Sequence, residues 1–243
     1  MWSRMRLVKS YELLEEKAID EAIIENTTTI NNKKVKMYIE KIIKRFVDII
    51  MGLIGTLILI PITIGIFIAR KILHEDDGPI FYEQLRIGKD GKVFRMYKYR
   101  SMVIGADEKL STYLKENEEA RKEYSKYKKL KNDPRITKVG KFIRKTSIDE
   151  FPQFINVLLG QMSLVGPRPY LPREQEDMGN YYKYIIQCKP GITGYWQTSG
   201  RSGVTFDDRL KMDYKYCQKR SLKVDAKLLM KTILNVVKKE GAI

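Results

Sequence analysis

The sequence predicts a predominantly helical α+β protein attached to a membrane, and three observations support this prediction. An uncharged run, Ile49–Ala69, is long enough to enter a bilayer. Two β-prone segments, about 80–87 and 92–99, lie on either side of a Gly-Lys-Asp-Gly turn and predict a small β-hairpin. Apolar residues at helical spacing recur before and after these segments. We expect an N-terminal extension (1–40), a membrane helix (41–73) and a cytosolic domain (74–243).

The composition indicates an anionic partner. The chain has 46 Lys and Arg residues against 30 acidic residues, a formal net charge of +16. Such an excess suits a nucleic acid, a phosphorylated small molecule or an acidic membrane surface. The two cysteines, Cys188 and Cys217, form no CxxC motif, which excludes a zinc ribbon and gives no disulfide framework, as suits a reducing cytoplasm. With His74 as the single histidine, proton transfer and nucleophilic attack fall by default to carboxylates, Lys, Tyr or Cys.

The N-terminal extension is expected to be a short exposed helix followed by a tether. Residues 11–24 have helical spacing and a mainly acidic polar face. The segment NTTTINN (26–32) that follows is polar and is interpreted as a linker. We assign no chemistry to either segment.

The uncharged run is expected to insert into a membrane. As a helix rising ~1.5 Å per residue it would be about 30 Å long, the thickness of the hydrocarbon layer. A long charged segment precedes it, which argues against a signal peptide. The alternative, a buried core helix, would be unusually uniform in its apolar character for a domain of this size.

The flanks of this run predict how it inserts. Positive residues favour the cytoplasmic side, yet they occur at both ends: Lys41, Lys44 and Arg45 before the run, Arg70 and Lys71 after it. A straight span cannot satisfy both flanks. We therefore expect a re-entrant helix that enters and leaves by the same face, with a tilted single span as the alternative.

Pro61 lies near the centre of the run, where its ring would kink the helix and leave the carbonyl of Leu57 without its helical donor. Thr56 or Thr63 could help to satisfy the freed backbone groups. Pro61 is therefore the expected site of the membrane kink.

Arg86, Lys98 and Arg100 are three of the basic residues in and directly after the hairpin. They either face a phosphate group or form a solvated basic edge, and the sequence favours neither. Residues 105–131 have interspersed charges at helical spacing, which is typical of a solvated surface helix. The last stretch, 221–241, alternates apolar residues with lysines and predicts an amphipathic helix at the membrane interface or on the core.

The segment KTSIDEFPQ (145–153) has two interpretations. Ser147 and Glu150 have the spacing of a capping box, in which each side chain satisfies a free backbone N–H at a helix start. Asp149 and Glu150 are also adjacent carboxylates at the positive end of that helix, which favours anionic groups and anionic ligands. A Gly-Pro-Arg-Pro turn (166–169) follows, in which the prolines hold Arg168 for bidentate phosphate contact or form only a rigid surface turn.

At this point the sequence resembles a known family, the bacterial sugar transferases, which are monotopic polyprenyl-phosphate phosphoglycosyl transferases. The resemblance covers nearly everything from Lys44 to Ala242. It depends on five fragments in order: KRFVD, GPIFYEQLRIGKDGKVFRMYKYRSM, DPRITKVGKFIRKTSIDEFPQ, NVLLGQMSLVGPRP and KPGITGYWQTSGRS. Each fragment is moderately specific, and the ordered set is highly specific. The resemblance implies a re-entrant helix kinked near a proline, in agreement with the flanking charges.

The resemblance implies an enzyme that transfers a sugar 1-phosphate from a UDP-sugar to undecaprenyl phosphate and releases UMP. The reaction starts the assembly of capsule, exopolysaccharide or O-antigen glycans at the cytoplasmic face of the cell membrane. Asp149 would be the nucleophile and a Mg²⁺ ligand, and Glu150 would orient it, bind the metal or serve as a helix cap. Arg144 and Arg168 match phosphate-contacting arginines. Weaker candidates lie in the Gly-rich segment 191–201, either a mobile loop over the nucleotide sugar or a plain linker: Gln197 and Arg201.

Two other functions would each account for part of the sequence. A nucleic-acid-binding protein would account for the net charge but not for the uncharged run, so no nucleic acid partner is expected. A non-enzymatic membrane scaffold or regulator of polysaccharide export would account for the membrane segment. The sequence does not indicate the sugar, for which glucose and galactose are favoured and N-acetylated sugars stay open. It leaves a homo-oligomer open as well. The single membrane run indicates the compact catalytic module, so 74–243 is expected to be the catalytic domain.

Overall fold

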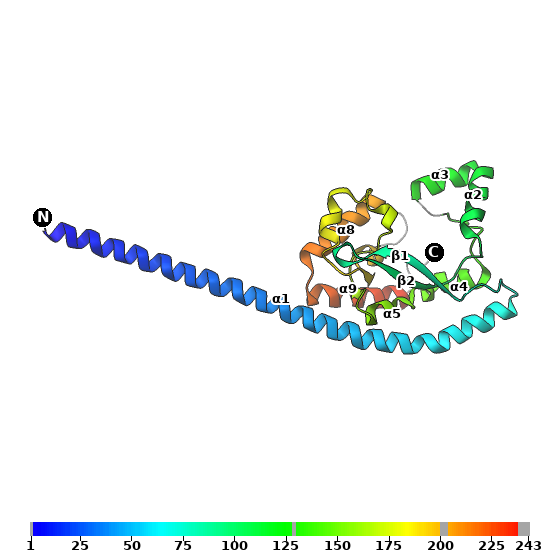
Figure 1. The fold of residues 1–243 in the computed structure, drawn as a ribbon, viewed down its shortest axis with the longest axis horizontal. Helices are drawn as coiled ribbons and strands as arrows, with labels where there is room; N and C mark the ends of the chain where they lie inside the picture. Colours follow the sequence, from blue (N-terminus) through cyan, green and yellow to red (C-terminus); the bar gives the residue numbers. More distant parts are fainter. Residues whose placement is uncertain (1, 128–129, 200–203, 238–243) are drawn as a thin grey trace. The chain divides into compact units, whose positions relative to one another are not determined.

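The computed structural model describes residues 2–127, 130–199 and 204–237 (Figure 1). The chain divides into two compact units, Met1–Phe46 and Val47–Ile243. The first unit consists of the N-terminal part of one helix, α1 (Trp2–Ile72). The helix continues through 26–32, where the sequence predicts a linker. No Gly or Pro precedes Gly52, and Thr and Asn each cost only a few tenths of a kcal/mol in a helix, so nothing in this polar segment ends it.

The second unit contains the apolar part of α1. The helix continues through Pro61, and two threonine hydroxyls donate to carbonyls one turn back. Thr56 Oγ1 donates to the Gly52 carbonyl at 2.7 Å, and Thr63 Oγ1 to the Leu59 carbonyl at 2.7 Å. Such bonds bend helices, and this part of α1 is visibly curved in Figure 1. Neither bond reaches the carbonyl of Leu57. The kink at Pro61 and the route into the bilayer stay predictions.

The β-hairpin prediction is confirmed. β1 (Phe81–Ile87) pairs antiparallel with β2 (Val93–Tyr99), and their ends pair as Phe81 with Tyr99 and Ile87 with Val93. The turn between them places Asp90 and Gly91 at φ of 58° and 75°, the left-handed region that Asp and Gly tolerate best. Side chains alternate across the strands, so Arg86, Met96 and Lys98 share one face of the hairpin.

Helix α5 (Gln153–Leu158) joins the hairpin to α1. Asn156, fully buried on α5, accepts from the Tyr97 backbone N–H at 3.0 Å and donates to the Arg95 carbonyl at 2.7 Å. On the other side of α5, a Cβ added at Gly55 of α1 would meet the Phe154 ring at 2.3 Å, so a glycine is required for this close approach. Figure 1 shows this part of α1 passing beneath α5.

Helices and one small sheet complete the second unit. Strand β3 (Ser163–Val165) pairs in parallel with β4 (Gly191–Thr193). The remaining α-helices are α2 (Ala106–Glu116), α3 (Glu118–Tyr127), α4 (Lys138–Lys145), α6 (Tyr182–Ile185), α7 (Tyr195–Thr198), α8 (Phe206–Lys219) and α9 (Leu222–Val237). The charged stretch expected as one surface helix is two helices, because the Asn117 side chain accepts from the Ala120 backbone N–H at 2.9 Å and starts α3.

Apolar side chains are exposed on four helices of the second unit. One helical segment, Lys34–Ile72, is long and apolar enough to cross a membrane, and only 22% of its most apolar stretch is buried. Further exposed apolar residues lie on α4, at the end of α5 and on α9, and Figure 1 shows these helices along the same side as the apolar part of α1: Phe142, Leu159, Met230, Ile233 and Leu234. Exposed apolar patches of this kind mark interaction surfaces.

Candidate active site

The turn between α4 and α5 carries the two carboxylates expected at the site. Thr137 caps α4 by accepting from the Gly140 backbone N–H at 2.9 Å. After α4, Ser147 adopts a left-handed conformation (φ 58°, ψ 16°), and a short 3₁₀ turn, Ile148–Glu150, follows. Left-handed backbone in a residue other than glycine costs roughly 1 kcal/mol or more, and such strain is common at functional sites.

The capping box predicted for Ser147 and Glu150 is wrong. An N-cap residue needs an extended backbone so that its side chain can accept from an N–H of the first turn. The left-handed backbone of Ser147 does not provide this geometry, and its side chain makes no capping hydrogen bond. The Glu150 carboxylate instead forms an ion pair with Lys98 of β2, with Nζ and Oε1 3.2 Å apart.

Asp149 is half-buried, and neighbouring charges of both signs act on the pKa of its carboxyl. Burial, followed by the negative charge of Glu150, raises its pKa from 3.8 to about 6. The positive charges of Lys98 and Arg144 act in the opposite direction. Three other sequence-predicted residues therefore lie close enough to Asp149 for their charges to shift its pKa: Glu150, Lys98 and Arg144. At neutral pH most of the Asp149 carboxyl is ionised and able to act as a nucleophile.

A cavity of about 130 Å³ adjoins this turn. It takes its lining from both strands of the hairpin, the 3₁₀ turn, α5, the Gly-Pro-Arg-Pro turn, β4 and α7. The lining residues are Arg86, Met96, Lys98, Glu150, Gln153, Arg168, Pro169, Gly191, Ile192, Trp196 and Gln197. Five sequence-predicted site residues are among them, whereas Asp149 is not, although its sequence neighbour Glu150 is.

The Gly-Pro-Arg-Pro turn and the Gly-rich segment form one wall because their backbones touch. The Gly191 backbone N–H donates to the Pro167 carbonyl at 2.8 Å. A Cβ added at Gly191 would lie 2.0 Å from the Gly166 nitrogen, so only glycine permits this approach. Two segments about 25 residues apart are thereby placed side by side.

Arg86 is a buried cation with unused donor capacity. Its Nη1 donates to the Pro169 carbonyl at 3.0 Å, and its Nη2 donates to Gln84. Its buried Nε has no partner within the described part of the chain. Burial, followed by the charge of Arg168, lowers the pKa of Arg86 from 12.5 to about 10, so the side chain stays protonated at neutral pH.

Arg168 is held at the cavity through its own backbone and through an aromatic ring. Its backbone N–H donates to Asp213 Oδ2 at 3.0 Å, and the same oxygen accepts from the Tyr170 hydroxyl at 2.7 Å. The guanidinium carbon lies 5.4 Å from the centre of the Trp196 ring, at cation–π distance. The buried Nε of Arg168 likewise lacks a partner among the residues that the structure describes.

Helix α8 contributes two residues that the sequence did not single out. Arg209 lies 5.2 Å from the Trp196 ring centre, and burial followed by the charge of Arg168 lowers its pKa. Asp213, one helical turn on, is fully buried, and burial raises its pKa to about 7. The i, i+4 spacing of Arg209 and Asp213 was the available signal, but it has meaning only once α8 is known to pack on this turn.

The other sequence-predicted residues have different places. The Arg100 side chain is bonded to Asp76 and does not line the cavity. Arg144 lies in the last turn of α4, and its positive charge favours the ionised forms of Asp133 and Asp149, although the pKa of Asp149 is raised overall. Gln197 is buried with an unpartnered Oε1 at the cavity, as far as the described residues extend. Arg201 lies outside the described residues.

The carboxylates of Asp149 and Glu150 could bind Mg²⁺ only if water and substrate phosphate supplied the other ligands. The described residues contain no group of three or more His, Cys, Asp or Glu side chains that could hold a metal ion. Mg²⁺ commonly binds through one or two carboxylates and completes its shell with water and substrate phosphate. The adjacent carboxyls of Asp149 and Glu150 fit that donor set, because a cation there would offset the repulsion that raises the pKa of Asp149.

Comparison with known proteins identifies the family. A family model for bacterial sugar transferases matches residues 39–239, which include the hairpin, the carboxylate turn and the cavity. The chain belongs to the bacterial sugar transferase family. Its matched region contains every site residue named above.

Several curated relatives of this sugar transferase are similar over most of its length. An undecaprenyl-phosphate galactose phosphotransferase of Salmonella typhimurium is 44% identical over 202 residues, covering 83% of this chain and 42% of the relative. An exopolysaccharide production protein of Rhizobium meliloti is 37% identical over 199 residues, 82% of this chain and 87% of the relative. A UDP-glucose:undecaprenyl-phosphate glucose-1-phosphate transferase of Escherichia coli is 35% identical over 207 residues, with coverage of 80% and 40%. The chain thus spans less than half the length of several relatives that it matches.

Proposed function

We propose that this sugar transferase moves a sugar 1-phosphate from a UDP-sugar to undecaprenyl phosphate, releases UMP and so starts the assembly of an exopolysaccharide, capsule or O-antigen glycan. The observation that carries the proposal is the cavity lined by Arg86 and Arg168 beside two carboxylates. Arg86 is buried and Arg168 is half-buried, and each has a buried Nε without a partner among the described residues. Their positive charges repel one another, and an anionic ligand with several oxygens relieves this repulsion. The diphosphate of a UDP-sugar has this chemistry, and two of the relatives are named for undecaprenyl-phosphate substrates.

The proposed reaction has two phosphoryl transfers at the same phosphorus. First, an Asp149 carboxylate oxygen attacks the β-phosphorus of the UDP-sugar. The bond from that phosphorus to the bridging oxygen breaks, and UMP leaves with the electron pair. Second, a phosphate oxygen of undecaprenyl phosphate attacks the phosphorus of this acyl phosphate on Asp149. Asp149 is released as a carboxylate, and the product is an undecaprenyl diphosphate sugar.

Neighbouring residues have supporting roles in this scheme. Arg168 and Arg86 stabilise negative charge on the transferring phosphoryl group, with no reorganisation needed at the moment of reaction. Lys98 holds Glu150 in an ion pair and favours the ionised form of Asp149. A bound Mg²⁺ would supply neutralisation of the diphosphate charge that opposes an anionic nucleophile. Asp149 and Glu150 are the residues that would hold it.

A direct assay tests the proposed activity. The full chain, purified in detergent, is incubated with undecaprenyl phosphate, Mg²⁺ and one UDP-sugar at a time: glucose, galactose and their N-acetylated forms. We expect UMP release with at least one sugar and a lipid product of the corresponding mass. A non-enzymatic scaffold or export regulator would release no UMP above the level without protein, and that result for every sugar would contradict the proposal.

We further propose that α1 inserts as a re-entrant helix and holds the protein on the cytoplasmic face of the membrane. The basic flanks and the exposed apolar residues of α1, α4, α5 and α9 support this arrangement. Single cysteines introduced as Lys41→Cys and Lys71→Cys test it, because Cys188 and Cys217 are buried. In sealed vesicles, an impermeant thiol reagent should label both positions from the same side. Labelling from opposite sides would establish a straight span.

A further inference from the structure

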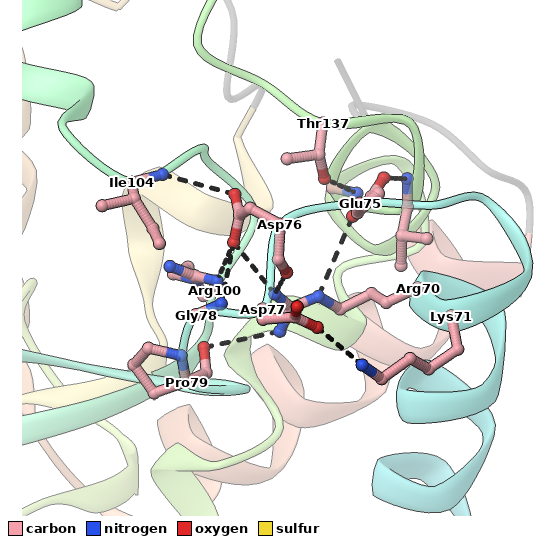
Figure 2. A network of polar contacts seen from close by, with 12 residues as sticks. Arg70, Lys71, Glu75, Asp76, Asp77, Gly78, Pro79, Arg100, Ile104 and Thr137 are labelled. Carbon is pink, nitrogen blue, oxygen red and sulfur yellow. Dashed lines mark hydrogen bonds and ion pairs between the residues drawn. The ribbon is translucent and has the colours of Figure 1, made fainter.

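The end of α1 is tied to the domain that follows by an acidic segment, Glu75–Asp77. Figure 2 shows that two of its three side chains point inward, toward arginines and backbone N–H groups of separate elements. We refer to Arg70, Glu75, Asp76 and Arg100 as the junction. None of these residues lines the cavity, and the roles proposed above do not account for them.

Asp76 is the centre of the junction. Its Oδ1 accepts from Arg70 Nη2 at 3.2 Å, from the Gly78 backbone N–H at 3.1 Å and from Arg100. Its Oδ2 accepts from the Ile104 backbone N–H at 3.4 Å. Burial raises the pKa of Asp76, but hydrogen bonding from Gly78 and the charge of Arg100 outweigh it and lower the pKa overall. The carboxylate is therefore ionised. It lies between the last turn of α1, which carries Arg70, and the segment after β2, which carries Arg100.

Gly78 leaves the space that Arg100 needs. A Cβ at Gly78 would lie 1.9 to 2.2 Å from the Arg100 guanidinium atoms. The side chains of Arg70 and Arg100 are only 9% and 11% exposed. The Asp76 side chain is 27% exposed, so these ion pairs are partly buried, and losing one partner costs more than at the surface.

Glu75 extends the junction to α4. Its Oε1 accepts from the Val139 backbone N–H at 2.8 Å, one of the N–H groups at the helix start that have no partner within α4. Its Oε2 lies 3.9 Å from Arg70 Nε, and the Glu75 side chain is 8% exposed. The end of α1 is consequently bonded to the start of α4, the helix that ends just before the carboxylate turn.

Two short routes connect the junction with the proposed reaction centre. One runs from Glu75 along α4 to Arg144 and the turn that carries Asp149. The other runs from Asp76 to Arg100 and two residues back along β2 to Lys98, which pairs with Glu150. The end of α1 is therefore connected to Asp149 through α4 and to Glu150 through β2.

We propose that the junction is a positioning device that fixes the carboxylate turn relative to α1, and that it serves the lipid-borne acceptor rather than the soluble donor. The inference rests on the proposed function. A UDP-sugar reaches the cavity from water whatever the depth of the site. The phosphate of undecaprenyl phosphate is confined to the headgroup layer, so Asp149 must be held at that depth, and α1 is the element that sets it.

Asp76→Asn tests the inference, with Asp77→Asn as the matched control. Asp77 is in the same segment, its carboxylate is 85% exposed and its partner is the exposed Lys71, so the control makes the same change of charge without touching the junction. UMP release in a single turnover without acceptor should stay within twofold for both variants. Transfer to undecaprenyl phosphate in lipid vesicles should fall at least tenfold for Asp76→Asn alone, with an increased KM for the lipid. A short-chain, water-soluble polyprenyl phosphate should restore turnover.

Glu75→Gln provides a second variant that keeps an acceptor for Val139 and loses the charge facing Arg70. It should show the same split between the two half-reactions, at a smaller magnitude. Equal loss of both half-reactions in these variants, or no loss in either, would overturn the inference while leaving the proposed function intact. If the unaltered chain releases no UMP, the proposed function is wrong and the inference is overturned with it.

Discussion

Asp149→Asn should reduce UMP release from the UDP-sugar by on the order of 10³-fold or more, because an uncharged amide cannot attack phosphorus. The variant has nearly the same shape, so binding of the donor in the cavity should be largely preserved. The measurement is UMP release with saturating UDP-sugar, together with intact mass of the protein after incubation without acceptor. The unaltered chain should gain the mass of one phosphosugar, and the variant should gain none.

Glu150→Gln is the matched control for the nucleophile. Glu150 lines the cavity and pairs with Lys98, so its loss should weaken turnover by a smaller factor while the phosphosugar adduct still forms on Asp149. Full residual turnover in Asp149→Asn, or an adduct missing only in Glu150→Gln, would move the nucleophile to Glu150.

The fold of Asp149→Asn should remain intact. Burial and the charge of Glu150 raise the pKa of Asp149 in the folded protein to about 6, above its usual 3.8. The stability that this carboxyl contributes is therefore complete below pH 3.8 and is lost as the pH rises through about 6. At pH 7.5 the folded protein bears the cost of a buried charge, which the amide does not. The melting temperature of the variant should be equal to or above that of the unaltered chain.

The same pKa predicts the pH dependence of the first half-reaction. Attack requires the carboxylate, so UMP release should fall as the pH decreases, with a midpoint at or below about 6 because a bound Mg²⁺ favours the ionised form. A rate that increases as the pH falls through this range would mean that Asp149 acts as an acid.

Secondary structure that depends on residues adjacent in the sequence could be predicted. The hairpin follows from a Gly-Lys-Asp-Gly turn between β-prone segments, and its strands, Phe81–Ile87 and Val93–Tyr99, begin and end within a residue of the expected bounds. The apolar helix follows from composition. The capping box failed because Ser147 lies between two helices that pack in the same core. Ile143 of α4 and Ile155 of α5 belong to one cluster, and the chain reverses between them through a left-handed residue. Packing thus overrode a local preference of about 1 kcal/mol.

Candidate site residues that stand in a motif of one segment could be predicted from the sequence. Those brought to the site by packing between two segments could not. Asp149, Glu150 and Arg168 stand in recognisable motifs. Arg209 and Asp213 reach the candidate site only because α8 packs on the Gly-Pro-Arg-Pro turn, a contact that spacing cannot reveal. Arg100 was expected to face either phosphate or solvent. Sequence alone does not indicate which anion an arginine meets, and the structure gives it Asp76.

Arg168→Ala should lower turnover by about 10²–10³-fold, the range found when one preorganised electrostatic contact to a transition state is removed. The guanidinium is held over Trp196 and the residue lines the cavity, so its loss removes a positive charge from the cavity wall. The measurement is the rate of UMP release and of transfer to undecaprenyl phosphate, each followed separately. Arg173→Ala, an exposed arginine five residues on, should leave both rates unchanged.

Arg168→Lys separates charge from shape. Lysine keeps the positive charge but lacks the planar fork for bidentate contact with phosphate and stacks less well on an indole. We expect it to recover only part of the loss, and full recovery would show that charge alone suffices. Because the phosphoryl group occupies the same place in both transfers, Arg168→Ala should slow both half-reactions alike. Asp76→Asn should slow only the second, so the two variants distinguish stabilisation of the phosphoryl group from positioning at the membrane.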